Sequence, residues 1–302
     1  MSDKRGFIRR FCRSSQTYLH SIELFEQKRI FWGMKFKYAA SFLFFILFAL
    51  FSTGCVTTHV HKFRMTASES PEVHGANTQQ KPYSSSWRFT AKANYNDEKK
   101  VDITEDTRDS PDLDKLFDSP TVFKDAKFMM GGLDFSGKID FLYKANSFVI
   151  GGGLGYKDGL FSHLTMGANY SHFEFGTFIG MYNQYSEIEY WGEKGEDCND
   201  SENYCTKFSD QNYHIYTSIF AGMYAGFYFD KLFFNLSVSS YSPNPRVNGT
   251  DLDVPGIATA YLITGYRLNR WLEISVGGII THIGTSESKD NAGVTGGISF
   301  YL

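Results

Sequence analysis

From residue 87 to the C-terminus, apolar and polar residues alternate with a period of two. In the first run, Trp87 and Phe89 point to one face, and Arg88 and Thr90 point to the other. Such alternation is typical of a strand with one apolar and one polar face. The pattern recurs along the chain and predicts ten strands, at about 87–95, 132–143, 147–156, 160–171, 173–190, 213–229, 232–241, 257–268, 271–282 and 292–302. No run has the period of a helix, so we expect an all-β fold.

Two architectures produce this pattern, and they place the apolar face on opposite sides. A soluble sandwich or lipocalin-like barrel buries it, whereas a transmembrane barrel turns it towards lipid. Most runs here are 9 to 18 residues long, which is long for a globular sheet but suits tilted membrane spans. Aromatic residues gather at the strand ends, among them Tyr143, Tyr170 and Trp271, as they do at membrane interfaces.

The connections between the predicted strands alternate in length. Long connections at 96–126, 191–212, 242–256 and 283–291 alternate with turns at 144–146, 171–172, 230–231 and 269–270, and only 157–159 is unusually tight. Outer-membrane barrels have long external loops and short periplasmic turns. We therefore expect an antiparallel transmembrane up-and-down β-barrel of about ten strands, with eight or twelve as alternatives. An even strand number places both ends of the barrel on the periplasmic side.

The last strand, GVTGGISFYL, keeps the alternation at Val294, Ile298, Phe300 and Leu302. It resembles the C-terminal insertion signal of small bacterial outer-membrane β-barrel proteins, in which the terminal residue is aromatic rather than Leu. Residues 85–302 as a whole resemble this class, either OmpA/OmpW-like or of omptin size. The resemblance implies a Gram-negative outer membrane and insertion by the barrel-assembly machinery.

The N-terminal region carries an export signal. The apolar run 39–51 is about 13 residues long, whereas a helix needs roughly 20 residues to cross a bilayer. Lys35 and Lys37 precede the run and small residues follow it, as in a secretory signal peptide, which we place at 34–54. An uncleaved anchor and an ordinary cleaved signal are the alternatives.

The end of this signal, Ser52-Thr53-Gly54-Cys55, resembles the lipobox of bacterial lipoproteins. The resemblance implies cleavage before Cys55, lipidation of its sulfur, and delivery to the outer membrane by the lipoprotein-sorting machinery. We interpret residues 1–33 as an upstream extension, with Met34 as the expected start and an extended n-region of the signal as the alternative. Residues 55–84 are poor in apolar side chains, so we expect a flexible tether between the lipid and a barrel domain at 85–302.

Charge and cysteine content agree with export. Removing residues 1–54 takes away 9 of the 30 basic and 3 of the 33 acidic residues, which leaves 21 basic and 30 acidic residues. This acidic balance argues against nucleic acid as a partner. In an oxidising compartment, Cys198 and Cys205 are expected to form a disulfide, since a zinc site would need two further ligands nearby.

The polar faces of the strands predict a charged interior. The candidate lumen charges are Arg88, Lys92, Asp134, Lys138, Asp140, Glu174 and Glu273. A barrel of ten strands is too narrow for an open channel, so we expect a mostly plugged interior held by salt bridges, with a narrow passage as the alternative. The glycines Gly151, Gly153 and Gly155 would admit a larger neighbour such as Tyr182, Tyr216 or Tyr224.

Enzymatic chemistry is a weaker interpretation. The omptin proteases and the lipid A deacylases and acyltransferases are barrels of this general kind and need a base, a carboxylate and a nucleophile. The candidates here are His214 or His282, with Glu187, Glu189 or Asp210, and Ser286. No spacing supports a specific set, so we predict no catalytic residue. We likewise predict no metal and no cofactor, with His59 and His61 or the acidic stretch 97–118 as the alternative ligands.

The sequence therefore predicts a lipid-anchored outer-membrane barrel with a structural or surface-interaction role. Its expected partners are outer-membrane lipids, the two assembly machineries and an unknown extracellular ligand that contacts the loop 192–212. Three alternatives remain: a narrow pore for small solutes, a hydrolase at the barrel rim, and a lipid-tethered soluble β domain.

Overall fold

The computed structural model describes residues 57–74, 81–104, 125–195, 206–247, 250–252, 254–285 and 289–302. They all belong to one compact unit, Thr57–Leu302. Within these ranges every regular element is a strand, and no helix there is long and apolar enough to cross a membrane. The predicted signal peptide, Cys55, Cys198, Cys205 and Ser286 lie outside the described residues.

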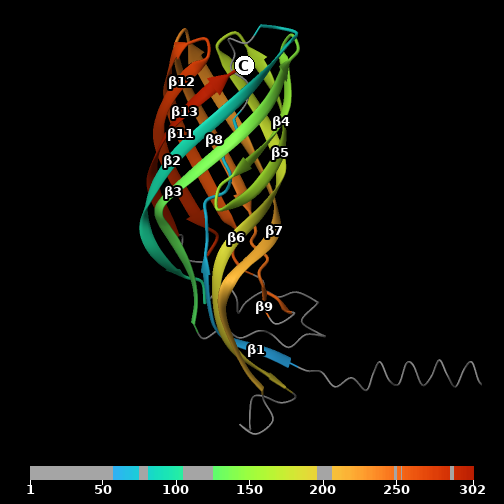
Figure 1. The fold of residues 1–302 in the computed structure, drawn as a ribbon, viewed down its shortest axis with the longest axis vertical. Helices are drawn as coiled ribbons and strands as arrows, with labels where there is room; N and C mark the ends of the chain where they lie inside the picture. Colours follow the sequence, from blue (N-terminus) through green and yellow to red (C-terminus); the bar gives the residue numbers. More distant parts are fainter. Residues whose placement is uncertain are drawn as a thin grey trace, which may run out of the picture. The chain divides into compact units, whose positions relative to one another are not determined.

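Ten antiparallel strands close into a barrel (Figure 1). They are β2 (Ser84–Asp102), β3 (Asp125–Lys144), β4 (Phe148–Tyr156), β5 (Gly159–Tyr170), β6 (Phe173–Gly195), β7 (Thr206–Phe229), β8 (Leu232–Tyr241), β11 (Ile257–Asn269), β12 (Leu272–Ile283) and β13 (Lys289–Tyr301). Pairing of β13 with β2 and of β3 with β4 closes the ring. Two short strands, β9 (Arg246–Val247) and β10 (Thr250–Asp251), pair within the connection from β8 to β11. The predicted all-β ten-stranded barrel is confirmed.

The apolar faces of the strands point outwards. Leu133 and Phe135 of β3 are 64% and 66% exposed, while Asn235 and Ser237 of β8 are almost completely buried. A water-soluble domain would not expose apolar residues along every wall strand, whereas a lipid-facing wall requires them. The molecule is thus an outer-membrane type of barrel, and the alternative of a soluble β domain is wrong.

The barrel has two distinct ends. The tight turns lie at one end, which we call the turn end, together with the C-terminus and the start of β2. There Trp87 and Leu302 exchange backbone hydrogen bonds of 3.0 and 2.9 Å. The strand ends that border the long connections lie at the opposite end, which we call the loop end. Part of the connection predicted at 192–212 is strand, since β6 continues to Gly195 and β7 begins at Thr206.

The exceptional turn at Lys157-Asp158-Gly159 makes the β4–β5 hairpin shorter than its neighbours. Strand β4 has 9 residues and β5 has 12, whereas β3 has 20 and β6 has 23. On the loop-end side of this turn, β3 and β6 therefore lose their partners β4 and β5. Two unpaired edges would be left in the wall.

An additional strand occupies this gap. Strand β1 (Thr57–Thr66) pairs in parallel with β3 from Lys62↔Asp125 to Thr66↔Met129, and antiparallel with β6 from Thr57↔Gly195 onwards. Val60, Phe63 and Met65 of β1 are completely buried and belong to an apolar core near the loop end. The prediction of a flexible tether over 55–84 is therefore wrong for this part of the chain.

Side-chain polarity reverses along β6. Ile179 and Met181 face outwards on the membrane side, whereas Glu187 and Glu189 occupy outer positions towards the loop end, where Ile188 is buried inside. Exposed tyrosines mark the change: Tyr95, Tyr156, Tyr185 and Tyr213. Aromatic rings are stable where hydrocarbon meets water, so the wall beyond this belt extends out of the membrane as a water-facing sheet.

Candidate functional site

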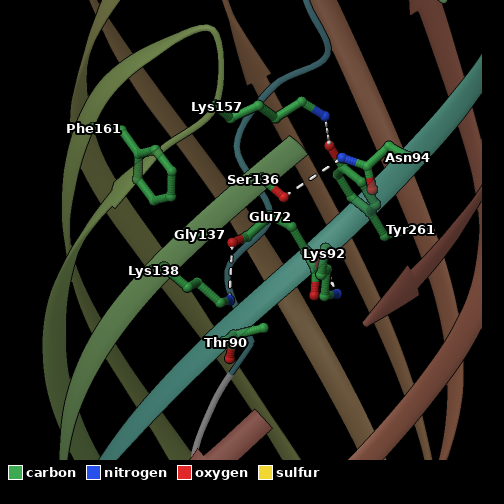
Figure 2. Close-up of a pocket in the computed structure, with 10 residues that line it drawn as sticks. All are labelled: Glu72, Thr90, Lys92, Asn94, Ser136, Gly137, Lys138, Lys157, Phe161 and Tyr261. Atoms are coloured by element: carbon green, nitrogen blue, oxygen red, sulfur yellow. Dashed lines mark hydrogen bonds and ion pairs between the residues drawn. The ribbon is translucent and has the colours of Figure 1, made fainter. Parts of the chain in front are cut away.

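Residues 67–74, which we call the inner segment, continue from β1 into the barrel. All eight residues are buried. The segment enters beside β3, where the amide of Ala67 donates to the carbonyl of Met129 at 2.9 Å. Figure 2 shows Glu72 of this segment among side chains that point inwards from the wall, including Lys92, Lys138 and Tyr261. The interior of the barrel therefore holds a stretch of its own chain.

Wall side chains satisfy the backbone of the inner segment. On β8, Ser237 donates to the carbonyl of Val73 at 2.7 Å, and Ser239 donates to that of Pro71 at 3.0 Å. Tyr241 continues this row by donating to the carbonyl of Ser68 at 2.8 Å. Because alternate residues of a strand point to the same face, β8 forms a row of hydroxyl donors that runs antiparallel to the segment.

Strand β11 and two cations complete these contacts. Tyr261 donates to the carbonyl of Ser70 at 2.7 Å, and Thr259 accepts from its amide at 2.9 Å. Arg88 donates to the carbonyl of His74 at 2.9 Å, and Lys138 to that of Glu72 at 3.1 Å. Buried peptide groups are costly without partners, so these bonds stabilise an irregular backbone inside the barrel.

The two carboxylates of the segment pair with cations of the barrel. Glu69 lies 2.8 Å from the ammonium group of Lys157, in the β4–β5 turn. Glu72 accepts from Lys92 and lies 2.9 Å from the Nδ1 atom of His74. Burial of an unpaired charge is strongly unfavourable, so each carboxylate depends on its partner for a stable position.

The wall carries further ion pairs. Arg88 donates to Asp140 through Nε at 2.9 Å and Nη2 at 2.6 Å. Arg267 contacts Glu273 at 2.6 Å, and Tyr301 donates to Glu273 at 2.7 Å. In each pair two guanidinium N–H groups donate to the same carboxylate oxygen, Oδ2 of Asp140 and Oε1 of Glu273. These charge-assisted bonds fix the side chains across neighbouring strands.

The structure places the seven sequence-predicted lumen residues on the inner face of the wall. Six are buried: Arg88, Lys92, Lys138, Asp140, Glu174 and Glu273. Asp134 is partly exposed and lies 3.7 Å from Lys157. Glu174 accepts from Asn169 at 2.9 Å. Sequence reasoning missed Glu69, Glu72 and Lys157, because the first two lie in the presumed tether and the third in a turn.

The buried charges of the wall and of the inner segment balance one another. Among the described residues, the barrel buries five cations, Arg88, Lys92, Lys138, Lys144 and Lys157, and three carboxylates, Asp140, Glu174 and Glu273. The inner segment adds two buried carboxylates, Glu69 and Glu72. The segment thus supplies the negative charge that balances the wall.

The glycines of β4 do not face the tyrosines that the sequence suggested. A Cβ on Gly155 would lie 2.3 Å from Phe161, and one on Gly153 would lie 2.6 Å from Asp140. Tyr224 instead lies over Gly167 and Gly176, with its hydroxyl 2.3 and 2.5 Å from the added Cβ positions. The predicted match of Gly151, Gly153 and Gly155 with Tyr182, Tyr216 or Tyr224 is wrong because β5 and β6 carry the glycines that Tyr224 covers.

The candidate histidines of the rim lie on different strands and pair with different carboxylates. His214 of β7 is 3.4 Å from Asp210, and His282 of β12 is 2.9 Å from Asp290. Glu189 binds Lys62 of β1, and Glu187 accepts from Gln211. Each of these groups therefore has a partner within the sheet, and the candidate nucleophile Ser286 lies outside the described residues.

The remaining candidates from the sequence are the possible metal ligands and the residues of the C-terminal insertion signal. His61 contacts Trp191 in a tilted arrangement, with ring centroids 4.7 Å apart. Within the described ranges no three His, Cys, Asp or Glu side chains form a metal-binding group. In the last strand, Ile298, Phe300 and Leu302 are exposed, as expected of a lipid-facing edge of the wall.

Solved structures with a distant similarity to this chain include two outer-membrane proteins. The outer membrane protease OmpT from Escherichia coli has 10% sequence identity and a TM-score of 0.34, covering 75% of this chain and 100% of its own. The toluene transporter TodX from P. putida has 8% identity and a TM-score of 0.27, covering 73% of this chain and 90% of its own. No protein-family model matches the chain, and no curated protein matches it.

Proposed function

We propose that the protein is an outer-membrane barrel closed by its own inner segment, with a structural or surface-interaction role. The observation that carries this proposal is the burial of residues 67–74 among wall side chains. These contacts include two ion pairs and a row of hydrogen bonds to the backbone. A ten-stranded barrel has little spare room inside, so a bound segment of this size leaves no passage for solutes.

The surface for interaction is the part of the wall beyond the tyrosine belt. There β1, β3, β6 and β7 form a sheet whose outer face carries charged residues, including Lys62, Arg64, Asp125 and Glu189. Outer-membrane barrels place their long loops outside the cell, so in this proposal the sheet is in contact with the surroundings. A macromolecular partner that contacts this sheet is part of the proposal.

The lipid anchor at Cys55 remains a prediction, because this residue lies outside the described part of the chain. Within the described part, β1 begins at Thr57, which pairs with Gly195 at the loop end.

Conductance in planar bilayers tests the closed state. We expect the purified protein to conduct almost no current, because the inner segment fills the barrel. The double variant Glu69→Gln, Glu72→Gln should open intermittently, since it removes both segment charges and leaves Lys92 and Lys157 to repel one another. The opened barrel should prefer chloride over potassium because the wall has excess cations.

Glu189→Gln is the matched control, because it removes a carboxylate of β6 on the outer face of the wall and leaves the barrel interior unchanged. It should stay closed like the parent protein. Steady, large conductance of the parent protein would contradict the proposal, and so would a double variant that never opens although its barrel is intact.

A further inference from the structure

The inner segment has three titratable side chains among its eight residues: Glu69, Glu72 and His74. All three are buried, and together they carry two negative charges while the histidine is neutral. If each group takes up one proton, the segment carries one positive charge instead. The wall buries more cations than carboxylates, so each proton weakens the attraction between the segment and the wall or adds repulsion.

His74 is the group of the segment with an ordinary pKa closest to neutrality, about 6.5. Its Nδ1 atom lies 2.9 Å from Oε1 of Glu72 and 3.3 Å from the ammonium group of Lys138. Arg88 donates to its carbonyl at 2.9 Å. Burial and these two cations hold the pKa of His74 well below its usual range, although Glu72 acts in the opposite direction. Docked His74 is therefore neutral, and its release into water favours uptake of a proton.

The wall around His74 is mainly cationic. Its titratable and charged groups come from β2, β3 and β5: Arg88, Lys92, Lys138, Asp140 and His163. Asp140 is the one carboxylate in this set, and Arg88 engages it at 2.6 Å. A positive charge on docked His74 would thus add to three wall cations, with the one carboxylate already paired. Protonation and docking of the segment therefore oppose each other.

The two carboxylates of the segment respond at lower pH, since an ordinary Glu side chain has a pKa of about 4.3. Burial alone would raise the pKa of Glu72, but Lys92 and Lys138 hold it well below its usual range. Burial acts in the same way on Glu69, where Lys157 lowers the pKa. All three groups of the segment therefore have a lower pKa when docked than when released. Docking is stabilised above the released pKa values and is lost as the pH falls through the docked values.

We propose that the inner segment is a proton-sensitive plug, which acid releases from the wall by protonating Glu69, Glu72 and His74 and so reversing the charge of the segment. This inference rests on the closed barrel proposed above and adds the condition that opens it. Release takes up one proton, at His74, between about pH 6.5 and pH 4.3, and up to three protons below that range. Each proton changes the ratio of open to closed barrels about tenfold per pH unit. Strand β1 is held by apolar side chains such as Phe63, so it stays docked in acid and retains the segment.

Conductance of the full-length protein in planar bilayers, measured at constant salt from about pH 7.5 to about pH 3.5, tests the switch across all three transitions. We expect almost no current at neutral pH. Below about pH 6.5 the open fraction should rise about tenfold per pH unit, and it should rise more steeply below about pH 4.3. Return to neutral pH should close the barrel again, and unboiled gels should show an intact barrel throughout.

Variants of His74 identify the sensor. His74→Gln stays neutral at every pH, so its open fraction should not change between about pH 6.5 and pH 4.3, while the steeper rise below this range remains. His74→Lys places a fixed positive charge at the same position and should open at neutral pH with an intact barrel. His172→Gln is the control, because this histidine lies exposed in the turn between β5 and β6. It should open with the same pH dependence as the parent protein.

The outcomes separate the switch from the closed barrel on which it rests. A parent protein that stays closed at every pH would overturn the switch and leave the closed barrel intact. Steady conductance at neutral pH would contradict both. Loss of the pH dependence in His163→Gln, with His74→Gln behaving like the parent protein, would place the sensor in the wall and overturn the proposal. Acid-induced current that persists at neutral pH, with the barrel lost on unboiled gels, would show denaturation and overturn it as well.

Discussion

At the residue scale, an irregular segment can lie inside this barrel because single side chains replace the missing β-ladder. Ser237 and Ser239 of β8 each donate to a carbonyl of the inner segment, and Tyr261 of β11 donates to another. Backbone groups that are removed from water need such partners. Small hydroxyl residues at inward positions thus select both the depth and the direction of the segment.

Two glycines of β3 lie where its pairing with β2 shifts register, between Asn96 and Lys99, and substitutions at these two positions can be compared directly. Gly131 and Gly132 have φ values of +100° and +102°, which disfavour any side chain. A Cβ on Gly131 would lie 2.2 Å from the carbonyl oxygen of Asp97, whereas one on Gly132 would meet nothing within 4 Å. Gly132→Ala should therefore cost about 1–2 kcal/mol from backbone strain alone.

Gly131→Ala should cost clearly more, because it adds a collision with backbone atoms to the same strain. Urea unfolding in detergent, followed by the shift in gel mobility on boiling, measures both variants. Equal stability of Gly131→Ala and Gly132→Ala would show that the close approach to Asp97 is absent.

At the scale of elements, the short β4–β5 hairpin explains why the chain needs β1. The alternation of apolar and polar residues predicted this hairpin and its tight turn, because lipid outside and polar groups inside act on every residue of a wall strand. It did not predict β1. The stretch 57–66 has a bulge between Val60 and Lys62 that breaks the period of two, and its partners β3 and β6 lie far away in sequence.

Docking of β1 rests on a few buried side chains. Phe63 is completely buried, and its replacement by Ala should cost about 3–5 kcal/mol, enough to release β1 while the ten wall strands remain paired. Trypsin should then cleave the Phe63→Ala variant after Lys62 or Arg64, whereas the parent protein resists. Thr66→Ala, at an exposed position, is the control and should resist as well.

Rapid cleavage of the parent protein at Lys62, with the barrel intact on unboiled gels, would contradict the docking of β1. Resistance of Phe63→Ala equal to that of the parent would contradict the importance of this side chain.

At the scale of the whole molecule, the barrel wall and the inner segment complement each other in charge. The inward residues Arg88, Lys92 and Lys138 could be picked out from the sequence because strand periodicity fixes which face a residue occupies. The segment could not, since residues 67–74 have no periodicity and their partners come from several distant strands. A site that is formed by long-range contacts leaves no local signature.

Accessibility of a single thiol tests the central claim, which is that the inner segment lies inside the barrel. Ser70 is completely buried and its Oγ atom has no partner, so Ser70→Cys should fold normally. The variant is made in a Cys198→Ser, Cys205→Ser background, which keeps Cys12 and Cys55. The same background without the added cysteine gives the baseline labelling of these two residues. Lys207→Cys, exposed at the loop end, is the positive control.

Intact outer membranes are treated with a maleimide linked to polyethylene glycol, and the gel shift is read before and after denaturation. The structure predicts that Lys207→Cys reacts at once and that Ser70→Cys reacts only after the barrel is unfolded. Fast labelling of Ser70→Cys in the folded barrel would contradict the account, because the segment would then lie outside the wall.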